Sequence, residues 1–210
     1  MEKEELIKKL IREGYLKSEK VIDAMRSIPR EIFVPKRQRK FAYEDIPLDI
    51  GHGQTISAPH MVAIMLEALN LDEKSKVLEI GTGTGYHACV ASKIAKNGKI
   101  FTIERIKELA EKAKENFKNL KIKNIVSIIG DGSVGLPEYA PYTHIYVTCS
   151  SPSIPDVLIK QLDEGGKLLI PVGRIYGDLW LIEKKNGIVK KNLGGCAFVP
   201  MIGREGYNED

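Results

Sequence analysis

Apolar residues recur at helical spacing through the first thirty positions of the chain. An amphipathic helix is predicted over residues 2–13, ending near Gly14, from Leu6, Ile7, Leu10 and Ile11. A second helix is predicted from the N-cap Ser18 to Pro29, with an apolar face of Val21, Ile22, Met25 and Ile28. Residues 30–56 are interrupted by proline and glycine, which predicts an irregular segment that we call the lid segment.

From Ser57 onward the pattern alternates between helix and strand. Ser57 and Pro59 predict the start of a helix, because serine is a favoured N-cap and proline is tolerated in the first turn. Strands are then predicted at 77–80, 100–103, 125–129, 144–148 and 167–170, with helices at about 86–96, 107–119 and 155–163. Two further strands, 179–183 and 188–199, predict a terminal hairpin around Asn186 and Gly187.

This alternation predicts an α/β fold, with helices on both faces of a mostly parallel sheet. The hairpin adds an antiparallel strand near the C-terminus, and the first two helices form an N-terminal cap on a Rossmann-like, doubly wound core. A length of 210 residues suits a single domain. We divide it into the N-terminal helices and lid segment (1–56), a ligand-binding core (57–175) and a terminal hairpin with a tail (176–210).

The composition excludes several classes of protein. Hydrophobic residues make up 43% and charged residues 29%, which is typical of a globular chain, and no apolar run approaches the roughly 20 residues of a membrane span. The first six residues, M-E-K-E-E-L, lack the apolar core of a signal peptide, so we expect a cytoplasmic location. Three scattered cysteines and four histidines without ligand spacing predict neither a disulfide framework nor a metal site.

The net charge of +4 is unevenly distributed. Residues 1–40 hold twelve Lys and Arg against seven Asp and Glu, a balance of +5, so the remaining residues sum to −1. A basic cluster at residues 36–40, K-R-Q-R-K, accounts for much of this difference. Such a cluster is typical either of a solvated loop or of a nucleic-acid contact.

Alternate glycines follow the first strand of the core. Residues 76–86 are K-V-L-E-I-G-T-G-T-G-Y, which places three glycines between a strand and a helix. Glycine lets the backbone bend sharply and approach a ligand, and the helix that follows presents free N–H groups. A glycine turn without a ligand is the alternative. We favour a nucleotide cofactor because acidic residues end the next two strands.

Those acidic residues are Glu104, after the second strand, and Asp131, between two glycines after the third. Ligands of open α/β sheets lie at these carboxyl ends of the strands. Glu104 is therefore a candidate acceptor for a ribose diol, and Asp131 for the amino group of adenine. The alternatives are a surface glutamate and an Asx-turn residue.

Glu79, two positions before the first glycine, separates the candidate cofactors. The dinucleotide fingerprint G-x-G-x-x-G must hold a pyrophosphate, which a carboxylate aimed at the loop would repel. Here the spacing is G-x-G-x-G, and a carboxylate suits a cationic ligand such as S-adenosyl-L-methionine (AdoMet). The pattern E-x-G-x-G-x-G, with Glu104 and the G-D-G of residues 130–132, resembles the class I AdoMet-dependent methyltransferases.

A second resemblance involves segments outside this pattern. Residues 46–61 are I-P-L-D-I-G-H-G-Q-T-I-S-A-P-H-M, and later segments include T-I-E-R-I, G-D-G-S-V-G-L-P-E-Y-A-P-Y, L-I-P-V-G and F-V-P-M-I-G. Together they closely resemble the protein-L-isoaspartate O-methyltransferase family, from about Leu16 to Gly203. The Q-T-I-S-A-P-H segment is the most specific part, since most class I methyltransferases lack it.

The resemblance implies methyl transfer from AdoMet to the free α-carboxyl group of L-isoaspartyl residues in damaged proteins, whose ester cyclises to a succinimide and reopens partly to aspartate. It implies Ser57 as the catalytic residue, and cofactor contacts from Gln54, Thr55, Ile56, Glu79, Gly81, Thr82, Gly83, Glu104, Arg105, Asp131 and Gly132. Thr148 and His60 are candidate substrate contacts, with a helix-surface histidine as the alternative for His60. We expect isoaspartyl-containing proteins as partners, no nucleic acid, no membrane, and a monomer.

The chemistry agrees with the absence of a recognisable catalytic triad in the sequence. A carboxylate is ionised at neutral pH, with a reference pKa of ~4, so it needs no general base to become a nucleophile. The protein must instead remove water and align an oxygen behind the methyl carbon. Ser57 would orient the carboxylate by a hydrogen bond. Its alternative is a helix N-cap, worth ~1 kcal/mol of stability.

Two other functions compete with this interpretation. The basic cluster supports a methyltransferase that acts on RNA, but residues 148–152, T-C-S-S-P, lack the Asn/Asp-Pro-Pro-aromatic motif that base N-methylating enzymes usually place there. The second is a non-enzymatic AdoMet-binding module. We disfavour it because Glu79, Glu104, Asp131 and Ser57 are all present.

Overall fold

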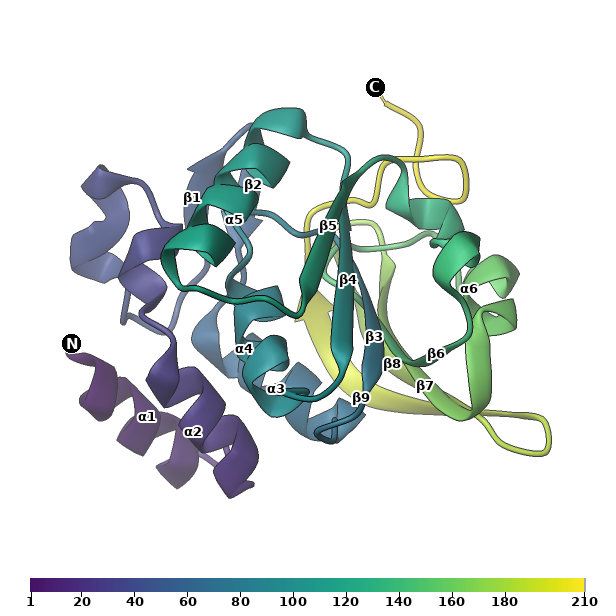
Figure 1. Cartoon of the computed structure of the whole chain (residues 1–210), viewed down its shortest axis with the longest axis horizontal. Coiled ribbons are helices and arrows are strands. Elements are labelled where there is room, and N and C mark those ends of the chain that lie inside the picture. Colours follow the sequence, from purple (N-terminus) through teal and green to yellow (C-terminus); the bar gives the residue numbers. More distant parts are fainter. Residues whose placement is uncertain (210) are drawn as a thin grey trace.

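The computed structural model describes residues 1–209, and its centre is a seven-stranded sheet with the order β5-β4-β3-β6-β7-β8-β9 (Figure 1). The first five strands of this order are parallel, and the last two are antiparallel to their neighbours. Their bounds are β3 Lys76–Ile80, β4 Lys99–Glu104, β5 Ile125–Ile129, β6 Tyr142–Val147, β7 Leu162–Gly173, β8 Tyr176–Lys184 and β9 Ile188–Ala197. The predicted α/β class, the mostly parallel sheet and the antiparallel C-terminal strands are confirmed.

Helices cover both faces of this sheet. One face packs against α3 (Pro59–Leu69), α4 (Tyr86–Ile94) and α5 (Lys107–Asn119), and Figure 1 shows α6 (Asp156–Lys160) on the other face. The two N-terminal helices, α1 (Lys3–Arg12) and α2 (Glu19–Ser27), pack outside α3 and α4 and share their apolar cluster. The second face is closed by α6 and by the short 3-10 helices η3 (Gly132–Val134) and η4 (Pro137–Tyr139).

The strand order reverses between β3 and β6. After β3 the chain adds β4 and β5 on one side, then crosses back to place β6 against the opposite edge of β3. The loops that leave β3 and β6 therefore diverge to opposite sides of the sheet, which opens a crevice at their carboxyl ends. This topology fixes where a ligand site belongs before any side chain is considered.

The predicted irregular lid segment contains more structure than the sequence pattern indicated. It holds two 3-10 helices, η1 (Arg30–Phe33) and η2 (Lys36–Phe41), and a two-stranded hairpin of β1 (Leu48–Gly51) and β2 (Gln54–Ile56). Strands this short present only one or two inward residues, such as Leu48 and Ile50, so their alternation is too brief to detect. The turn between them needs positive φ at three residues, two of which are glycine.

Several predicted boundaries were wrong. The N-cap of α3 is Ala58 and makes no side-chain capping bond, so Ser57 is not the cap. The lid segment supplies a substitute, because a carboxylate oxygen of Asp45 accepts a hydrogen bond from the backbone N–H of His60 at 2.9 Å. Strand β7 begins at Leu162, five residues before the predicted position, and α6 ends correspondingly early. The apolar pattern did not reveal the first part of this strand because that part is exposed and polar.

No helix among residues 1–209 combines the length and apolar content needed to cross a bilayer.

The helix α4 begins at a glycine that no other residue replaces easily. Gly85 has a φ of +91°, and a Cβ at this position would lie 2.5 Å from the Phe117 ring and 3.2 Å from Ala113. We expect Gly85→Ala to lower the free energy of unfolding by ~3 kcal/mol or more, the sum of left-handed strain and a clash in a packed core. Urea unfolding measures this loss.

Gly165 provides a matched control, because its φ is +78° and a Cβ there would meet nothing within 4 Å. Gly165→Ala should lose only the conformational part, ~1 kcal/mol. Equal losses for the two variants would contradict the proposed contact with Phe117.

Candidate active site

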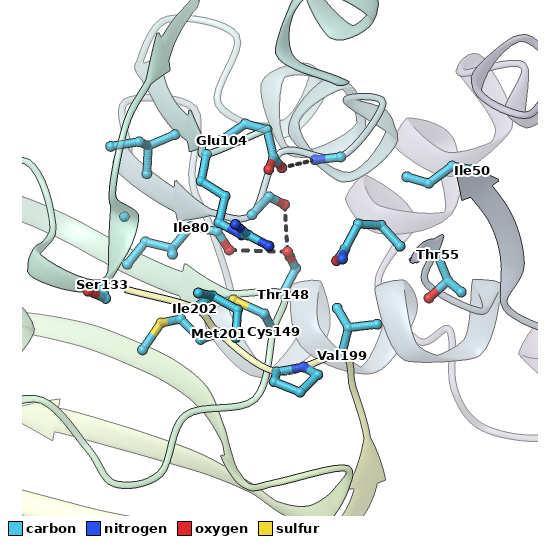
Figure 2. Close-up of a pocket in the computed structure, with 17 residues that line it drawn as sticks. Ile50, Thr55, Ile80, Glu104, Ser133, Thr148, Cys149, Val199, Met201 and Ile202 are labelled. Atoms are coloured by element: carbon cyan, nitrogen blue, oxygen red, sulfur yellow. Dashed lines mark hydrogen bonds between the residues drawn. The ribbon is translucent and has the colours of Figure 1, made fainter. Parts of the chain in front are cut away.

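Two adjoining chambers lie at the carboxyl ends of the strands around the β3–β6 crevice. The first chamber is a partly open pocket between these strand ends and the lid hairpin (Figure 2). Its lining comes from the ends of β3, β4 and β6, the turn after β5, the lid hairpin and the segment after β9. The residues are Ile50, Gln54, Thr55, Ile80, Gly81, Gly83, Ile103, Glu104, Arg105, Gly132, Ser133, Thr148, Cys149, Val199, Pro200, Met201 and Ile202.

The second chamber lies between the lid hairpin, the start of α3 and the start of α4. It is lined by Ile50, Thr55, Ile56, Ser57, Val62, Gly81, Thr82, Gly83, Thr84, Tyr86, His87 and Thr148. Five residues line both chambers: Ile50, Thr55, Gly81, Gly83 and Thr148. The glycine loop and Thr148 therefore form the boundary at which the two chambers meet.

That boundary is held by Thr148. Its hydroxyl donates to the backbone carbonyls of Ile80, at 3.1 Å, and of Gly81, so it ties the end of β6 to the end of β3. A Cβ on Gly81, whose φ is +93°, would lie 2.4 Å from the Thr148 hydroxyl oxygen. Glycine at position 81 is thus required by backbone conformation and by this close approach.

Glu104 lines the first chamber where the sequence placed it, at the end of β4. One carboxylate oxygen accepts a hydrogen bond from the backbone N–H of Gly83 at 2.9 Å, and the other from Ile106 at 3.0 Å. Figure 2 shows the Glu104 side chain among the residues that line the chamber. Each oxygen retains a lone pair, which is what a diol donor on a ligand requires.

Glu79 lies in a different environment from the one expected. It lines neither chamber, because strand alternation turns it to the face covered by α4, where it is fully buried. Its two oxygens accept hydrogen bonds from the hydroxyls of Thr102 and of Tyr146, the latter at 3.0 Å. Burial raises the pKa of Glu79 to about 8, with the nearby Glu104 carboxylate adding to the rise.

Around the turn after β5, Gly132 reaches the first chamber but the side chain of Asp131 does not. The Asp131 oxygens accept from the backbone N–H groups of Ser133 and Arg204, both at 2.8 Å, and these bonds lower its pKa although partial burial opposes the shift. Asp131 thus has the Asx-turn geometry that the sequence left open, and it anchors the C-terminal segment. Its contact with adenine stays a prediction.

The lid hairpin brings its candidate residues to both chambers. Gln54 lines the first, Ile56 and Ser57 line the second, and Thr55 lines both. Behind them the buried guanidinium of Arg30 donates to the carbonyls of Ser57 and Ala42, both at 2.9 Å. Burial lowers the pKa of Arg30 to about 10, so it stays charged at neutral pH while it fixes the backbone at Ser57.

The hydroxyl of Ser57 makes no hydrogen bond with any other residue that the structure describes. Since the capping task at α3 falls to Asp45, this hydroxyl is available to a ligand in the second chamber. His60 lines neither chamber; its imidazole Nδ1 lies 2.9 Å from the same Asp45 carboxylate. Of the other candidates, Thr82 lines the second chamber and Arg105 lines the first.

Sequence reasoning gave no role to the segment after β9, although residues 199–202 line the first chamber. This segment reaches the site because the backbone N–H of Met201 donates to the Ser150 carbonyl at 2.8 Å, and the Asp131 carboxylate accepts from the backbone N–H of Arg204. The F-V-P-M-I-G motif was the available signal. Ile50, Ser133 and Cys149 were also missed, since each is an ordinary residue that only the tertiary fold brings to the cavity.

The chain matches known proteins over almost its whole length. A family model described as protein-L-isoaspartate(D-aspartate) O-methyltransferase matches residues 1–206. A protein-L-isoaspartate O-methyltransferase from Methanococcus aeolicus is 55% identical over 209 residues, which covers 99% of this chain and 97% of the relative. One from Archaeoglobus fulgidus is 50% identical over 207 residues, covering 98% and 96%.

Solved structures agree with these sequence matches. A Plasmodium falciparum protein, described as a protein-L-isoaspartate O-methyltransferase in complex with S-adenosyl-L-homocysteine, superposes with a TM-score of 0.86 at 31% identity. The match covers 96% of this chain and 99% of that one. A second protein-L-isoaspartate O-methyltransferase structure gives a TM-score of 0.87 at 33% identity and covers 97% of this chain and 67% of its own.

The raised pKa of Glu79 has a consequence for stability. The folded state holds a proton at Glu79 up to a pKa of about 8, whereas the unfolded chain releases it near the ordinary glutamate pKa of 4.5. Folding therefore takes up a proton between these values, so stability falls as pH rises from about 4.5 to 8. We expect Glu79→Gln to remove the contribution of Glu79 to this pH dependence, so that the free energy of unfolding falls by a few kcal/mol less between pH 4.5 and 8.

Urea unfolding of both proteins at pH 5, 6.5 and 8 tests this expectation. Glutamine mimics the protonated carboxyl group: its amide oxygen accepts from Tyr146, and its amide N–H can donate to the Thr102 hydroxyl, so the variant should fold normally. Parallel pH profiles for the two proteins would show that Glu79 is ionised in the folded state and that the pKa assignment is wrong.

Proposed function

Because the chain belongs to the protein-L-isoaspartate(D-aspartate) O-methyltransferase family, we propose that it transfers a methyl group from AdoMet to the free α-carboxylate of L-isoaspartyl residues in damaged proteins. The observation that supports this most directly is the pair of chambers that meet at the glycine loop. One chamber has the features of a nucleoside site, and the other contains the free hydroxyl of Ser57. A methyl donor at their boundary would face an acceptor held beside Ser57.

The first chamber fits the adenosine part of AdoMet. The Glu104 carboxylate is positioned to accept from the ribose diol, and the backbone at Gly132 forms the wall beside which a base would lie. A Cβ at Gly132 would lie 2.7 Å from the Ile80 side chain, so this wall has no room for a larger residue. Bound AdoMet supplies an electrophilic methyl group on a sulfonium. The cofactor-binding roles of the residues named from the sequence are part of this proposal.

The reaction needs little acid–base chemistry from the protein. One bond forms between a carboxylate oxygen and the methyl carbon, the sulfonium–carbon bond breaks, and no proton moves. The carboxylate is already a nucleophile at neutral pH. The Ser57 hydroxyl would donate to one of its oxygens and leave the other aligned for attack, while Ile50, Ile56 and Val62 exclude water.

The biological setting is also part of the proposal. Partners are isoaspartyl-containing proteins, in which the methyl ester cyclises to a succinimide that reopens partly to aspartate. We propose a cytoplasmic location, which agrees with three cysteines that are all free. A monomer remains the expected state, and the division at residues 56 and 175 remains a prediction.

A peptide pair tests the reaction. One peptide contains isoaspartate and the other contains aspartate at the same position, and both are incubated with the protein and methyl-labelled AdoMet. We expect base-labile label on the isoaspartyl peptide only. Equal labelling of both peptides, or labelling of neither, would contradict the proposed function.

Ser57→Ala tests the role of the free hydroxyl. Loss of a hydrogen bond to a charged group costs ~1.5–3 kcal/mol, so we expect turnover to fall by about tenfold or more. The melting temperature should stay within ~2 °C, because Ala58 and Asp45 occupy the capping positions.

The matched control for this variant is Ser153→Ala, an exposed serine outside both chambers. It should change neither turnover nor melting temperature. If the activity lost in Ser57→Ala followed a fall in melting temperature, Ser57 would be a structural residue.

A further inference from the structure

The second chamber contains buried polar atoms that form no hydrogen bond with residues 1–209. Both ring nitrogens of His87 and the hydroxyl oxygen of Thr84 have no hydrogen-bond partner among the described residues. Each of these side chains is only 6% exposed, and both line the chamber. Buried polar groups in folded proteins are nearly always paired, so three unpaired atoms on two side chains of one chamber point to a polar ligand group that binds there.

The imidazole of His87 is held rigidly and without charge. Its ring packs on the Tyr146 ring, with 4.5 Å between the centroids, and Tyr146 is in turn fixed by its hydrogen bond to Glu79. Burial alone lowers the pKa of His87 to about 3, so the ring is neutral at physiological pH. A neutral imidazole presents one N–H donor and one acceptor nitrogen.

The donors around the second chamber suit a carboxylate. Thr84, His87 and Ser57 each offer one side-chain donor. The helix α4 begins at Tyr86, so its first N–H groups and its positive dipole end lie beside the same chamber. No Lys or Arg lines it, and the nearby Arg30 directs its donors to backbone carbonyls.

We propose that His87 and Thr84 bind a carboxylate of one of the two reactants and position it at the boundary with the first chamber. This proposal rests on the proposed function, which brings two carboxylates to this place: that of the isoaspartyl acceptor and that of the methionine part of AdoMet. Neutral donors orient a carboxylate without protonating it. If the bound carboxylate belongs to the isoaspartyl acceptor, it stays ionised and its free oxygen stays nucleophilic. If it belongs to AdoMet, its binding holds the methyl group aligned with the attacking oxygen.

His87→Leu separates this role from a structural one. Leucine fills a similar volume without polar atoms, so removal of an unpaired buried imidazole should leave the melting temperature of the ligand-free protein unchanged or raise it. We expect the variant to lose about tenfold or more in affinity for the carboxylate that His87 binds. His87→Gln, which restores a neutral donor and acceptor, should recover much of that loss.

The matched control is His144→Leu. His144 is also a partly buried histidine with a lowered pKa, about 4, but it lies on β6 away from both chambers. Its substitution should change no ligand affinity.

Two measurements identify the carboxylate. Calorimetry compares S-adenosyl-L-homocysteine with 5′-methylthioadenosine, which lacks the amino-acid part, and kinetics gives KM for the isoaspartyl peptide at saturating AdoMet. Weaker binding of S-adenosyl-L-homocysteine alone assigns His87 to the cofactor carboxylate. A raised peptide KM with unchanged S-adenosyl-L-homocysteine affinity assigns it to the acceptor.

Three results would overturn the proposal: no change in either affinity, an equal loss for 5′-methylthioadenosine, or a loss that follows a lowered melting temperature. The test also separates this proposal from the proposed function. If the unaltered protein labels no isoaspartyl peptide, the function fails, and the calorimetry alone then decides whether His87 binds a carboxylate.

Discussion

The contact between the ends of β3 and β6 is the constraint on which the site depends. The two strands are neighbours, but the chain leaves them toward opposite faces, so the backbone at Gly81 has to turn at once. The Thr148 hydroxyl holds that turn by binding the carbonyls of Ile80 and Gly81, in the space that a Cβ on Gly81 would fill. Because Gly81 and Thr148 line both chambers, the same contact shapes the boundary at which the two chambers meet.

Two glutamates close to this turn have opposite environments. Glu104 faces the first chamber and accepts from backbone N–H groups, whereas Glu79 is buried against α4 and has a pKa of about 8. A second full charge beside Glu104 would be costly in a buried setting, so a protonated Glu79 is the more stable arrangement. Glu79 then fixes the side chains of Thr102 and Tyr146. Thr102 in turn hydrogen-bonds to Thr82, and the Tyr146 ring packs on His87. We infer that its contribution to cofactor binding is indirect.

Much of the fold and part of the site follow from the sequence, for a physical reason. Strands that alternate with helices make a parallel sheet, and such a sheet places ligands at the carboxyl ends of its strands, so Glu104 and the glycine loop could be assigned to the cavity. The face toward which a strand-end residue points is harder to assign, as Glu79 illustrates. The lid hairpin and the segment after β9 depend on contacts between residues far apart in sequence, such as Asp131 with Arg204, which local patterns do not contain.

Ser57 illustrates the same limit at a single residue. A serine two positions before a proline at a helix start has two local interpretations, an N-cap or an available hydroxyl, and the local sequence alone does not decide between them. The decision comes from two residues of the lid segment. Asp45 accepts the hydrogen bond from the backbone N–H of His60, which a capping side chain would otherwise accept, and Arg30 donates to the carbonyl of Ser57. The Ser57 hydroxyl therefore makes no structural hydrogen bond with the described residues. The lid segment therefore contributes to the site by stabilising the start of α3 without Ser57, which leaves that hydroxyl unbonded at the wall of the second chamber.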